Sequence, residues 1–401
     1  MDNILALSPE TIERRKVVAD FMEEHIYPNE PVFERGGEEA EKLLKSLQQK
    51  TKAMGYWAPH LPKEAGGMGI GFLPYAYLNE IIGRSSAAPR AFGSQAPDSG
   101  NAEILHQYGT QEQKDKYLKP LVDGDIRSCF SMTEPAVSGA DPTGLQTTAV
   151  RDGDDFVING RKWFSSGAIG AQFAIVMAIT DPDAATHKRF SQILVPTDTP
   201  GFKIERRVEV WGDPNSNHPI IHYDNVRVPV TNLLGPQGNG FLLSQKRLGP
   251  GRIHHCMRAL GQAQRAFDLM VNRALNREAF GGPLADKQTI QNWIADSLVN
   301  IQAARLLTMQ AAHKIDQGDE ARVEVSMIKF FVVNVTCDVI DKAIQVHGAM
   351  GVTTDTPLQS MYKSARILRI ADGPDEVHRM VVARQVLRRY RTGDTWDFAA
   401  F

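Results

Sequence analysis

The sequence has few cysteines, no long apolar run and almost no excess of charge of either sign. Its 401 residues include three cysteines, Cys129, Cys256 and Cys337, and none stands at a metal-binding or redox spacing from another. This usage argues for a reducing compartment and against a disulfide framework. No apolar run approaches the ~20 residues that span a bilayer. The net charge of −2 gives no global attraction to nucleic acid or to an anionic membrane.

Signals for targeting and for nucleotide binding are also missing. Residues 1–13 carry neither the apolar core of a signal peptide nor an Arg-rich transit pattern, and Phe401 ends no peroxisomal tripeptide. The expected location is therefore cytoplasmic. The glycine-rich stretches 66–71 and 235–240 do not match the GxGxxG spacing, and there is no P-loop. Any nucleotide is therefore held in some other way than by a Rossmann fingerprint.

What is present is a mainly helical chain interrupted by a β-rich region. With 42% hydrophobic and 23% charged residues, the composition is that of a globular protein with a large core. The patterning predicts an N-terminal helical domain (1–126), a middle β domain (127–239) that forms a small barrel or sandwich, and a C-terminal bundle of about four helices (240–401). The predicted fold class is thus mainly α with a central β domain.

Two kinds of periodicity support this division. Short β-rich runs bounded by turn residues predict strands at 147–150, 156–158, 174–179, 192–195, 202–206 and 220–228. Apolar residues at helical spacing predict buried faces at Ile12, Val18, Met22 and Ile26; at Ile253, Met257, Leu260, Phe267, Val271 and Leu275; at Ile290, Ile294, Leu298 and Ile301; and at Ile328, Phe331, Val335 and Val339.

The stretch 370–378 lies between two apolar, helix-like runs and contains the most informative acidic residue. Gly373-Pro374 must end the first helix, because proline lacks an amide hydrogen and disfavours helical geometry in the residue before it. Asp375 and Glu376 suit the first turn of the next helix. Asp372 is left on a short connector in apolar surroundings, where it could accept a proton. The commoner fate of an Asp before Gly-Pro is that of a helix cap.

Four further segments carry chemistry-bearing residues. They are Phe130-Ser131-Met132-Thr133-Glu134-Pro135, Lys162-Trp163-Phe164-Ser165-Ser166-Gly167, Arg277-Glu278-Ala279-Phe280-Gly281 with Gln288 downstream, and Gln345-Val346-His347-Gly348-Ala349-Met350-Gly351. With Asp372 they make five motifs in order. Together with the three-domain layout, they make the chain resemble the acyl-CoA dehydrogenase family over nearly its whole length.

The resemblance implies an FAD-dependent acyl-CoA dehydrogenase of fatty acid metabolism and β-oxidation, and no metal. Asp372 would remove the α-proton of the acyl thioester, and the β-hydrogen would leave as hydride to the flavin, giving a 2-enoyl-CoA. The residues it implies for FAD are Phe130, Met132, Thr133, Trp163, Phe164, Ser165, Arg277, Phe280, Gln288, Gln345, Gly348, Ala349, Pro374 and Glu376. Those it implies for the substrate are Ser138, Gly373 and Arg252, with Arg252 opening the long helix.

The residue types suit these roles, although each has a simpler explanation. Backbone amides and hydroxyls of Met132, Thr133 and Ser165 would bond the flavin edge, and Trp163 would pack on its face. Arg277 offers a planar fork for a pyrophosphate. Alone, Trp163 would be a half-buried strand aromatic and Arg277 a solvated helix-end residue. His254 and His255 are expected to be ordinary helix residues.

Two departures from the family pattern narrow the resemblance. Asp372 replaces the usual Glu and is one methylene shorter, and 136–141 replaces the usual Gly-Ser-Asp with one added residue. The sequence around 95–101 and 163–168 is similar to the dehydrogenase module of acyl-CoA dehydrogenases 10 and 11, which are fused to a kinase-like domain. That branch implies an alternative, the redox-neutral dephosphorylating conversion of 4-phosphoacyl-CoA in 4-hydroxy acid catabolism, with the kinase expected on a separate chain.

The resemblance also implies partners. Arg277 and Phe280 would reach the flavin of a neighbouring subunit, so a homodimer or homotetramer is expected. An electron-transfer flavoprotein would accept the electrons of the dehydrogenase reaction. Two other classes on the same fold remain: a DNA-binding protein, for which Arg384, Arg388, Arg389 and Arg391 form a candidate basic patch, and a flavin monooxygenase. The net charge of −2 favours neither nucleic acid nor membrane as a partner.

Overall fold

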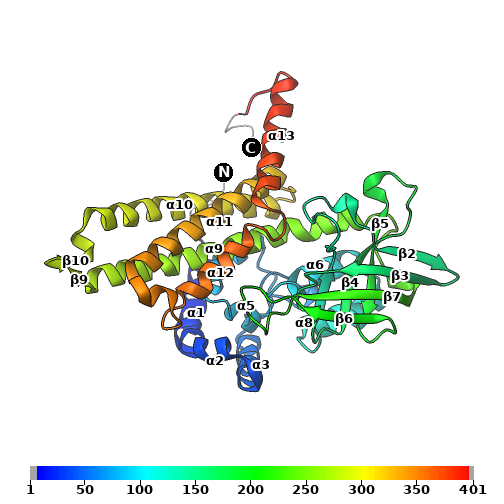
Figure 1. Cartoon of the computed structure of the whole chain (residues 1–401), viewed down its shortest axis with the longest axis horizontal. Helices are drawn as coiled ribbons and strands as arrows, with labels where there is room; N and C mark the ends of the chain where they lie inside the picture. The colour runs from blue at the N-terminus through cyan, green and yellow to red at the C-terminus, as the bar shows by residue number, and fades with distance from the viewer. Residues whose placement is uncertain (1–6, 397–401) are drawn as a thin grey trace. The chain divides into compact units, whose positions relative to one another are not determined.

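The computed structural model describes residues 7–396, which fold as two compact units (Figure 1). Within the described residues, one unit, the helical unit, comprises residues 7–50, Ile70–Ala91 and residues 252–396. The other, the mixed unit, comprises Thr51–Gly69 and Phe92–Gly251. The division into three domains at 126/127 and 239/240 stays a prediction.

Long helices dominate the helical unit, and α10 and α11 run side by side in it (Figure 1). Its main helices are α1 (Pro9–Phe21), α2 (Glu30–Arg35), α4 (Phe72–Ile82), α5 (Ala88–Ala91), α10 (Gln288–Asp316), α11 (Arg322–His347), α12 (Leu358–Leu368) and α13 (Asp375–Arg391). The unit also contains parts of two other helices, α3 (Gly37–Ala53) up to residue 50 and α9 (Gly240–Asn276) from residue 252 onward. The Ser8 side chain accepts a hydrogen bond from the Thr11 amide and Pro9 is the first helical residue, a combination typical of helix starts.

The core of the helical unit differs from the predicted faces in three places. Ile12 is 54% exposed, because Thr11, two turns before Val18, occupies the buried face instead. Leu275 and Leu298 are also exposed. The buried face in the second half of α9 is built from small or flexible residues, Ala263, Ala266, Met270 and Ala274. The predicted residues Ile253, Met257 and Leu260 are buried in the first half of this face, but farther along the helix the prediction favoured large apolar residues and missed these small ones.

The expectation that Arg252 opens the long helix is also wrong. Helix α9 begins at Gly240 and runs for 37 residues, with Pro250 inside it. Proline in a helix interior removes one hydrogen bond and usually kinks or ends the helix. Here the helix continues through it, so Arg252 lies well inside α9.

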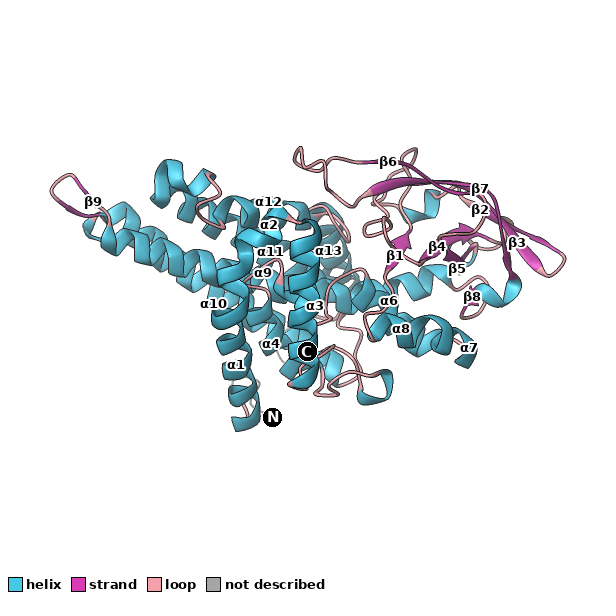
Figure 2. Ribbon diagram, turned by 90° about the horizontal axis from the view of Figure 1, so that it is seen from below, coloured by secondary structure: helices cyan, strands magenta, loops and turns pink. Residues whose placement is uncertain are grey.

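The mixed unit contains one eight-stranded sheet, drawn in magenta in Figure 2. Its strands are β1 (Ser128–Ser131), β2 (Thr148–Asp152), β3 (Asp155–Lys162), β4 (Phe173–Ile179), β5 (Phe190–Pro196), β6 (Phe202–Arg207), β7 (Pro219–Pro229) and β8 (Leu233–Leu234). The order is β6-β7-β3-β2-β4-β5-β8, and β1 pairs in parallel with β4. Each predicted strand is present, including the β2–β3 hairpin.

Strands β4 and β5 are buried on both faces, and apart from Ser191 and Gln192 of β5 their residues are apolar. Phe173, Ile175 and Leu194 pack with residues of α6 (Asp98–Tyr108) and α8 (Lys119–Val122). Ala174, Val176, Ile193 and Val195 pack instead with residues of β3 and β7. Continuous rather than alternating hydrophobicity is typical of such central strands. In the described residues no helix is long and apolar enough to cross a membrane.

Candidate active site

In the mixed unit, the two segments that resemble flavin-contacting motifs lie alongside each other at the ends of β1 and β3. The Trp163 amide donates to the Thr133 carbonyl at 3.0 Å, and the Thr133 hydroxyl donates back to the Trp163 carbonyl at 2.8 Å. The Ser131 and Ser165 hydroxyls are bonded at 2.8 Å, and the Tyr223 hydroxyl donates to Ser131 at 2.9 Å. These bonds fix residues 130–135 against residues 162–167.

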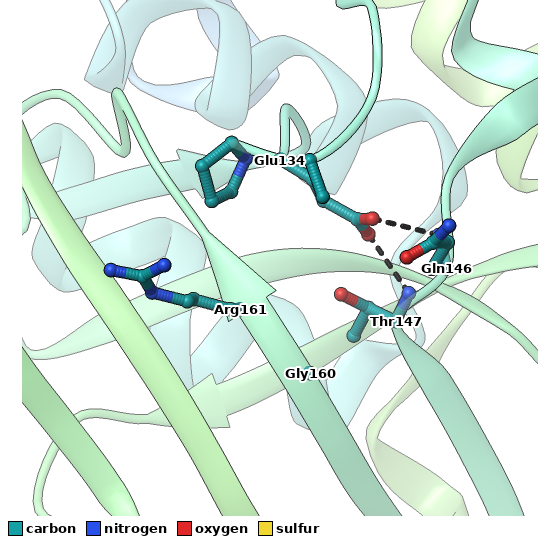
Figure 3. Close-up of a pocket in the computed structure, with 7 residues that line it drawn as sticks. Glu134, Gln146, Thr147, Gly160 and Arg161 are labelled. Carbon is teal, nitrogen blue, oxygen red and sulfur yellow. Dashed lines mark hydrogen bonds between the residues drawn. The ribbon is translucent and has the colours of Figure 1, made fainter.

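A buried ion pair adds a further connection between the same two segments. The Lys162 ammonium donates to Glu134 Oε1 at 2.8 Å and to the Met132 carbonyl at 2.7 Å, and the Lys162 side chain is fully buried. Glu134 also accepts the amides of Gln146 at 2.7 Å and Thr147 at 2.9 Å. The ammonium of Lys162 and the carboxylate of Glu134 thus both have hydrogen bonds to the backbone in addition to the bond between them. The pair lies beside a cavity of about 270 Å³ lined by Glu134, Pro135, Ala136, Gln146, Thr147, Gly160 and Arg161 (Figure 3).

The titration of this pair reflects burial and mutual attraction. Burial lowers the pKa of Lys162 to about 8, although the Glu134 carboxylate opposes the shift. For Glu134, burial would raise the pKa, but the charge of Lys162 and the hydrogen bonds from Lys162 and Thr147 outweigh it and lower the pKa. Glu134 is therefore a carboxylate at neutral pH.

This surface fits an aromatic heterocycle such as a flavin. The Trp163 and Phe164 rings meet edge to face with centroids 4.8 Å apart, and Phe164 is exposed. They offer flat apolar area beside polar backbone. The Thr133 and Ser165 hydroxyls already bond within the protein, so a bound flavin would be contacted chiefly through backbone groups of these segments. Phe130 lies beneath the Arg247 guanidinium, 4.1 Å from the ring centroid to the carbon of that group.

In the helical unit, Asp372 lies on the predicted connector between α12 and α13. Its φ is +55° and that of Gly373 is +102°, so the chain reverses sharply here. Asp375 and Glu376 form the first turn of α13 after Pro374, as predicted. Asp375 is buried and accepts hydrogen bonds from Arg369 and Asn334, at 2.9 and 2.8 Å.

The surroundings of Asp372 are cationic, which corrects the expectation of apolar surroundings. Its carbonyl accepts a bond from Arg252 Nε at 2.8 Å and one from His378 Nε2 at 3.3 Å. Lys329 of α11 donates to the carbonyls of Leu368 and Gly373. The expectation failed because the apolar neighbour in sequence, Ile370, is turned to solvent. The charged groups come from helices far away along the chain.

The carboxylate of Asp372 meets His255, which the sequence reasoning treated as an ordinary helix residue. His255 Nε2 lies 3.1 Å from Asp372 Oδ2. Arg252, His255 and Arg258 recur every three residues along α9, which places them on neighbouring turns of one side of the helix. That spacing was the signal in the sequence that could have identified the group. No sequence signal pointed to Lys329 or His378.

The pKa values around Asp372 follow from burial and charge. Burial lowers the pKa of Arg258 and of Lys329, and nearby acidic groups, Asp372 among them, oppose the shift. For His378, burial and then the charges of Arg252 and Lys329 lower the pKa to about 4. His378 is therefore neutral at physiological pH.

Most other predicted site residues lie on exposed ends of the long helices, and Ser138 lies in an exposed loop of the mixed unit. Phe280 is 97% exposed at the tip of a hairpin formed by β9 (Glu278–Ala279) and β10 (Gly282–Pro283), and Arg277 and Gln288 flank this hairpin on the surface. Gln345, Gly348 and Ala349 are exposed where α11 ends. Ser138 is exposed and accepts the Ala140 amide at 3.3 Å.

The helical unit does not bring the hairpin and Asp372 together. Twenty-five residues of α9 separate Arg252 from Arg277, which is about 37 Å at 1.5 Å per residue. Gln345 lies sixteen residues from Lys329 along α11, about 24 Å away. Gly348 ends α11 with φ +65° and ψ −141°, which lies outside the left-handed helical region.

Comparisons with known proteins agree along nearly the whole chain. Family models of acyl-CoA dehydrogenases match three parts: the N-terminal domain at 8–125, the middle domain at 129–226 and the C-terminal domain at 238–387. The chain is 50% identical to the "Probable acyl-CoA dehydrogenase FadE2" of Mycobacterium tuberculosis, over 96% of this chain and 98% of that protein. It is 44% identical to "Acyl-CoA dehydrogenase family member 11" of Mus musculus over 92% of this chain, and spans 49% of that protein's length.

Solved structures give the same result. A putative acyl-CoA dehydrogenase from Mycobacterium abscessus superposes with a TM-score of 0.90 and 43% identity, over 96% of this chain and 100% of the other. Similarity at this level and coverage extends to both compact units.

Proposed function

The chain belongs to the acyl-CoA dehydrogenase family and is thus an enzyme of the oxidoreductase class, and we propose that it is an FAD-dependent dehydrogenase of acyl-CoA in which Asp372 removes the α-proton. The observation that carries the proposal is the position of Asp372. The carboxylate lies on a short connector whose backbone is held by Arg252, His378 and Lys329. A base fixed in this way needs little reorganisation when it accepts a proton.

The cationic surroundings of Asp372 support the same chemistry. Removing a proton next to a thioester leaves negative charge on the substrate, and preorganised positive groups stabilise such charge in a water-poor site. Arg252, Arg258 and Lys329 supply that charge in the helical unit. Bound FAD would supply the two-electron acceptor for the β-hydrogen. The proposal assigns its binding to residues 130–135 and 162–167, with Pro374 and Glu376 as further contacts.

The exposed hairpin supports an assembly. Phe280 projects an almost fully exposed ring beside Arg277, and aromatic residues and arginine are enriched in the surfaces where proteins meet. We therefore assign Arg277, Phe280 and Gln288, with Gln345, Gly348 and Ala349, to contacts with the FAD of a neighbouring subunit in a homodimer or homotetramer. An electron-transfer flavoprotein is the proposed acceptor, and fatty acid β-oxidation the proposed process.

The test is direct. The purified protein should be yellow, and under anaerobic conditions its flavin absorbance should bleach with some members of an acyl-CoA series of increasing chain length. Asp372→Asn should retain the flavin and lose bleaching, because the amide has no basic oxygen. A colourless protein that takes up no FAD would contradict the proposal. Full bleaching by Asp372→Asn would show that this carboxylate is not the base.

A second candidate is the redox-neutral conversion of a 4-phosphoacyl-CoA. The observation that favours it is the excess of positive charge beside Asp372, where three buried or half-buried cations face this carboxylate. Such an excess suits a substrate with an additional anionic group. Release of inorganic phosphate from a 4-phosphoacyl-CoA without any added electron acceptor would favour this candidate over plain dehydrogenation.

A further inference from the structure

His255 lies between a guanidinium and the carboxylate of Asp372. Arg258 Nη2 is 3.2 Å from His255 Nδ1, and His255 Nε2 is 3.1 Å from Asp372 Oδ2. A guanidinium can only donate hydrogen bonds. Nδ1 must therefore accept the bond from Arg258, and the single proton of the neutral ring is left on Nε2, the nitrogen that faces Asp372.

The environment keeps this imidazole neutral. Burial lowers the pKa of His255, while Asp372 opposes the shift. A second proton would also have to displace Arg258 from Nδ1 and would add a cation beside Arg252 and Lys329. His255 is thus a permanent hydrogen-bond donor and does not take up or release protons at neutral pH.

A neutral donor on Oδ2 has two effects on the carboxylate. It restricts rotation of the side chain about its χ angles, and it stabilises the charged form, because a hydrogen bond donated to a carboxylate favours ionisation. The remaining groups that face this residue, Arg252 and Arg258 on α9, Lys329 on α11 and His378 on α13, add positive charge or hold the backbone.

We propose that His255 is a positioning residue, whose Nε2–H bond to Oδ2 orients the Asp372 carboxylate and keeps it ionised for proton removal. This rests on the proposed role of Asp372 as the base. In the proton transfer, the C–H bond at the α-carbon breaks and its electron pair stays on the substrate. The proton goes to Asp372 Oδ1. His255 keeps its own proton throughout, since Oδ2 of the resulting carboxylic acid still accepts the same bond.

Two amides of different length at position 255 test this. In His255→Gln the amide nitrogen takes about the place of Nε2 and keeps a donor toward Asp372, whereas in His255→Asn it reaches only the place of Nδ1. We expect His255→Gln to retain most of the turnover. We expect His255→Asn to lower kcat roughly tenfold to a hundredfold, as loss of alignment typically does, with KM changed by less than about twofold, because no substrate contact is removed.

The pH profile separates positioning from general damage. Without its donor, Asp372 becomes harder to ionise, so the acid limb of kcat/KM should move to higher pH in His255→Asn and stay in place in His255→Gln. The matched control is His254→Gln on the same helix, because His254 stacks on Phe72 with ring centroids 5.3 Å apart instead of facing Asp372. The control should leave the acid limb unchanged. Flavin content and circular dichroism verify that each variant is folded.

The outcomes separate this inference from the proposed function. Asp372→Asn should be inactive in two assays, bleaching of the flavin and exchange of the acyl α-protons with deuterated water. If it is inactive while His255→Asn and His255→Gln behave alike and keep the wild-type acid limb, the role of His255 is wrong and that of Asp372 stands. If Asp372→Asn exchanges α-protons at the normal rate, the proposed base itself is wrong. Nitrogen-15 shifts of His255 should report the Nε2-protonated form, and the Nδ1-protonated form would overturn the inference.

Discussion

The buried pair between Glu134 and Lys162 gives the sharpest test of how the mixed unit is held together. Lys162→Met keeps the length and apolar stem of the lysine but removes its charge, so the Glu134 carboxylate keeps the backbone amides of Gln146 and Thr147 as donors and loses its counter-ion. Glu134→Gln leaves the buried ammonium without its counter-ion. Breaking a buried ion pair on one side typically costs about 3–5 kcal/mol, because the remaining charge is uncompensated. We expect each single change to lower the free energy of unfolding by about that amount.

The double variant decides whether pairing or packing is responsible. With both charges gone, no uncompensated charge remains, and neutral replacement of a buried pair is often close to neutral in stability. The loss in Glu134→Gln/Lys162→Met should therefore be smaller than in either single variant, with a coupling of several kcal/mol in the cycle. Urea unfolding at pH 7, followed by circular dichroism with and without FAD, measures all four proteins.

A matched control lies one residue away on the same strand. Arg161 pairs with Glu205, but both side chains are exposed, and exposed pairs contribute little. The corresponding Arg161→Met and Glu205→Gln should unfold like the wild type within error. Losses below about 1 kcal/mol in the buried single variants, or additive effects in the double variant, would contradict the reasoning.

Three further outcomes follow from the helical unit. In the folded protein His378 stays neutral down to a pH of about 4, whereas in the unfolded chain a histidine gains its proton near pH 6.5. This difference in pKa contributes about 3 kcal/mol to the free energy of unfolding. The contribution is complete above pH 6.5 and is lost as the pH falls toward 4. His378→Asn should flatten that part of the curve of unfolding free energy against pH, and an unchanged slope would refute the assignment. Asp372→Glu should lower kcat by about a hundredfold, since the extra methylene displaces the carboxylate by about 1 Å; wild-type kcat would show that acid length is unimportant here. Phe280→Ser should weaken self-association in sedimentation experiments without changing the circular dichroism spectrum, and an unaltered mass at every dilution would contradict an interface at the hairpin.

Local patterns in the sequence were enough for the elements and for the position of the candidate base. The Gly373-Pro374 pair ends α12 and Asp375 and Glu376 begin α13, since these effects depend on neighbours in sequence. The β2–β3 hairpin follows from the turn at Gly153 in the same way. The resemblance of five ordered motifs supplied the family, which no single motif could.

The spacing of Arg252, His255 and Arg258 could have grouped these three residues, but their meeting with Asp372 could not be predicted, because it depends on contacts distant in sequence. His255, Lys329 and His378 come from three helices, and each meets the connector only after the bundle has formed. Lysine is also among the residues least often fully buried. Composition and pattern therefore give no reason to expect Lys162 and Lys329 inside the protein, although both are fully buried. The alanine-rich face of α9 was missed for a related reason, because small residues give weak hydrophobic periodicity even where helices pack most closely.

The shorter acid at position 372 has a structural explanation in the connector that carries it. A left-handed φ at a non-glycine residue is unfavourable and persists only where the surroundings enforce it. Here Arg252 and His378 bind the carbonyl of Asp372, and a Cβ added at Gly373 would lie 2.7 Å from His378 Nε2. The backbone is thus fixed on both sides of the side chain. The connector fixes the backbone and His255 lies 3.1 Å from Oδ2, so the fold sets how far the short side chain of Asp372 reaches. If Asp372 is the base that we propose, its position depends on the connector and not on the length of the acid.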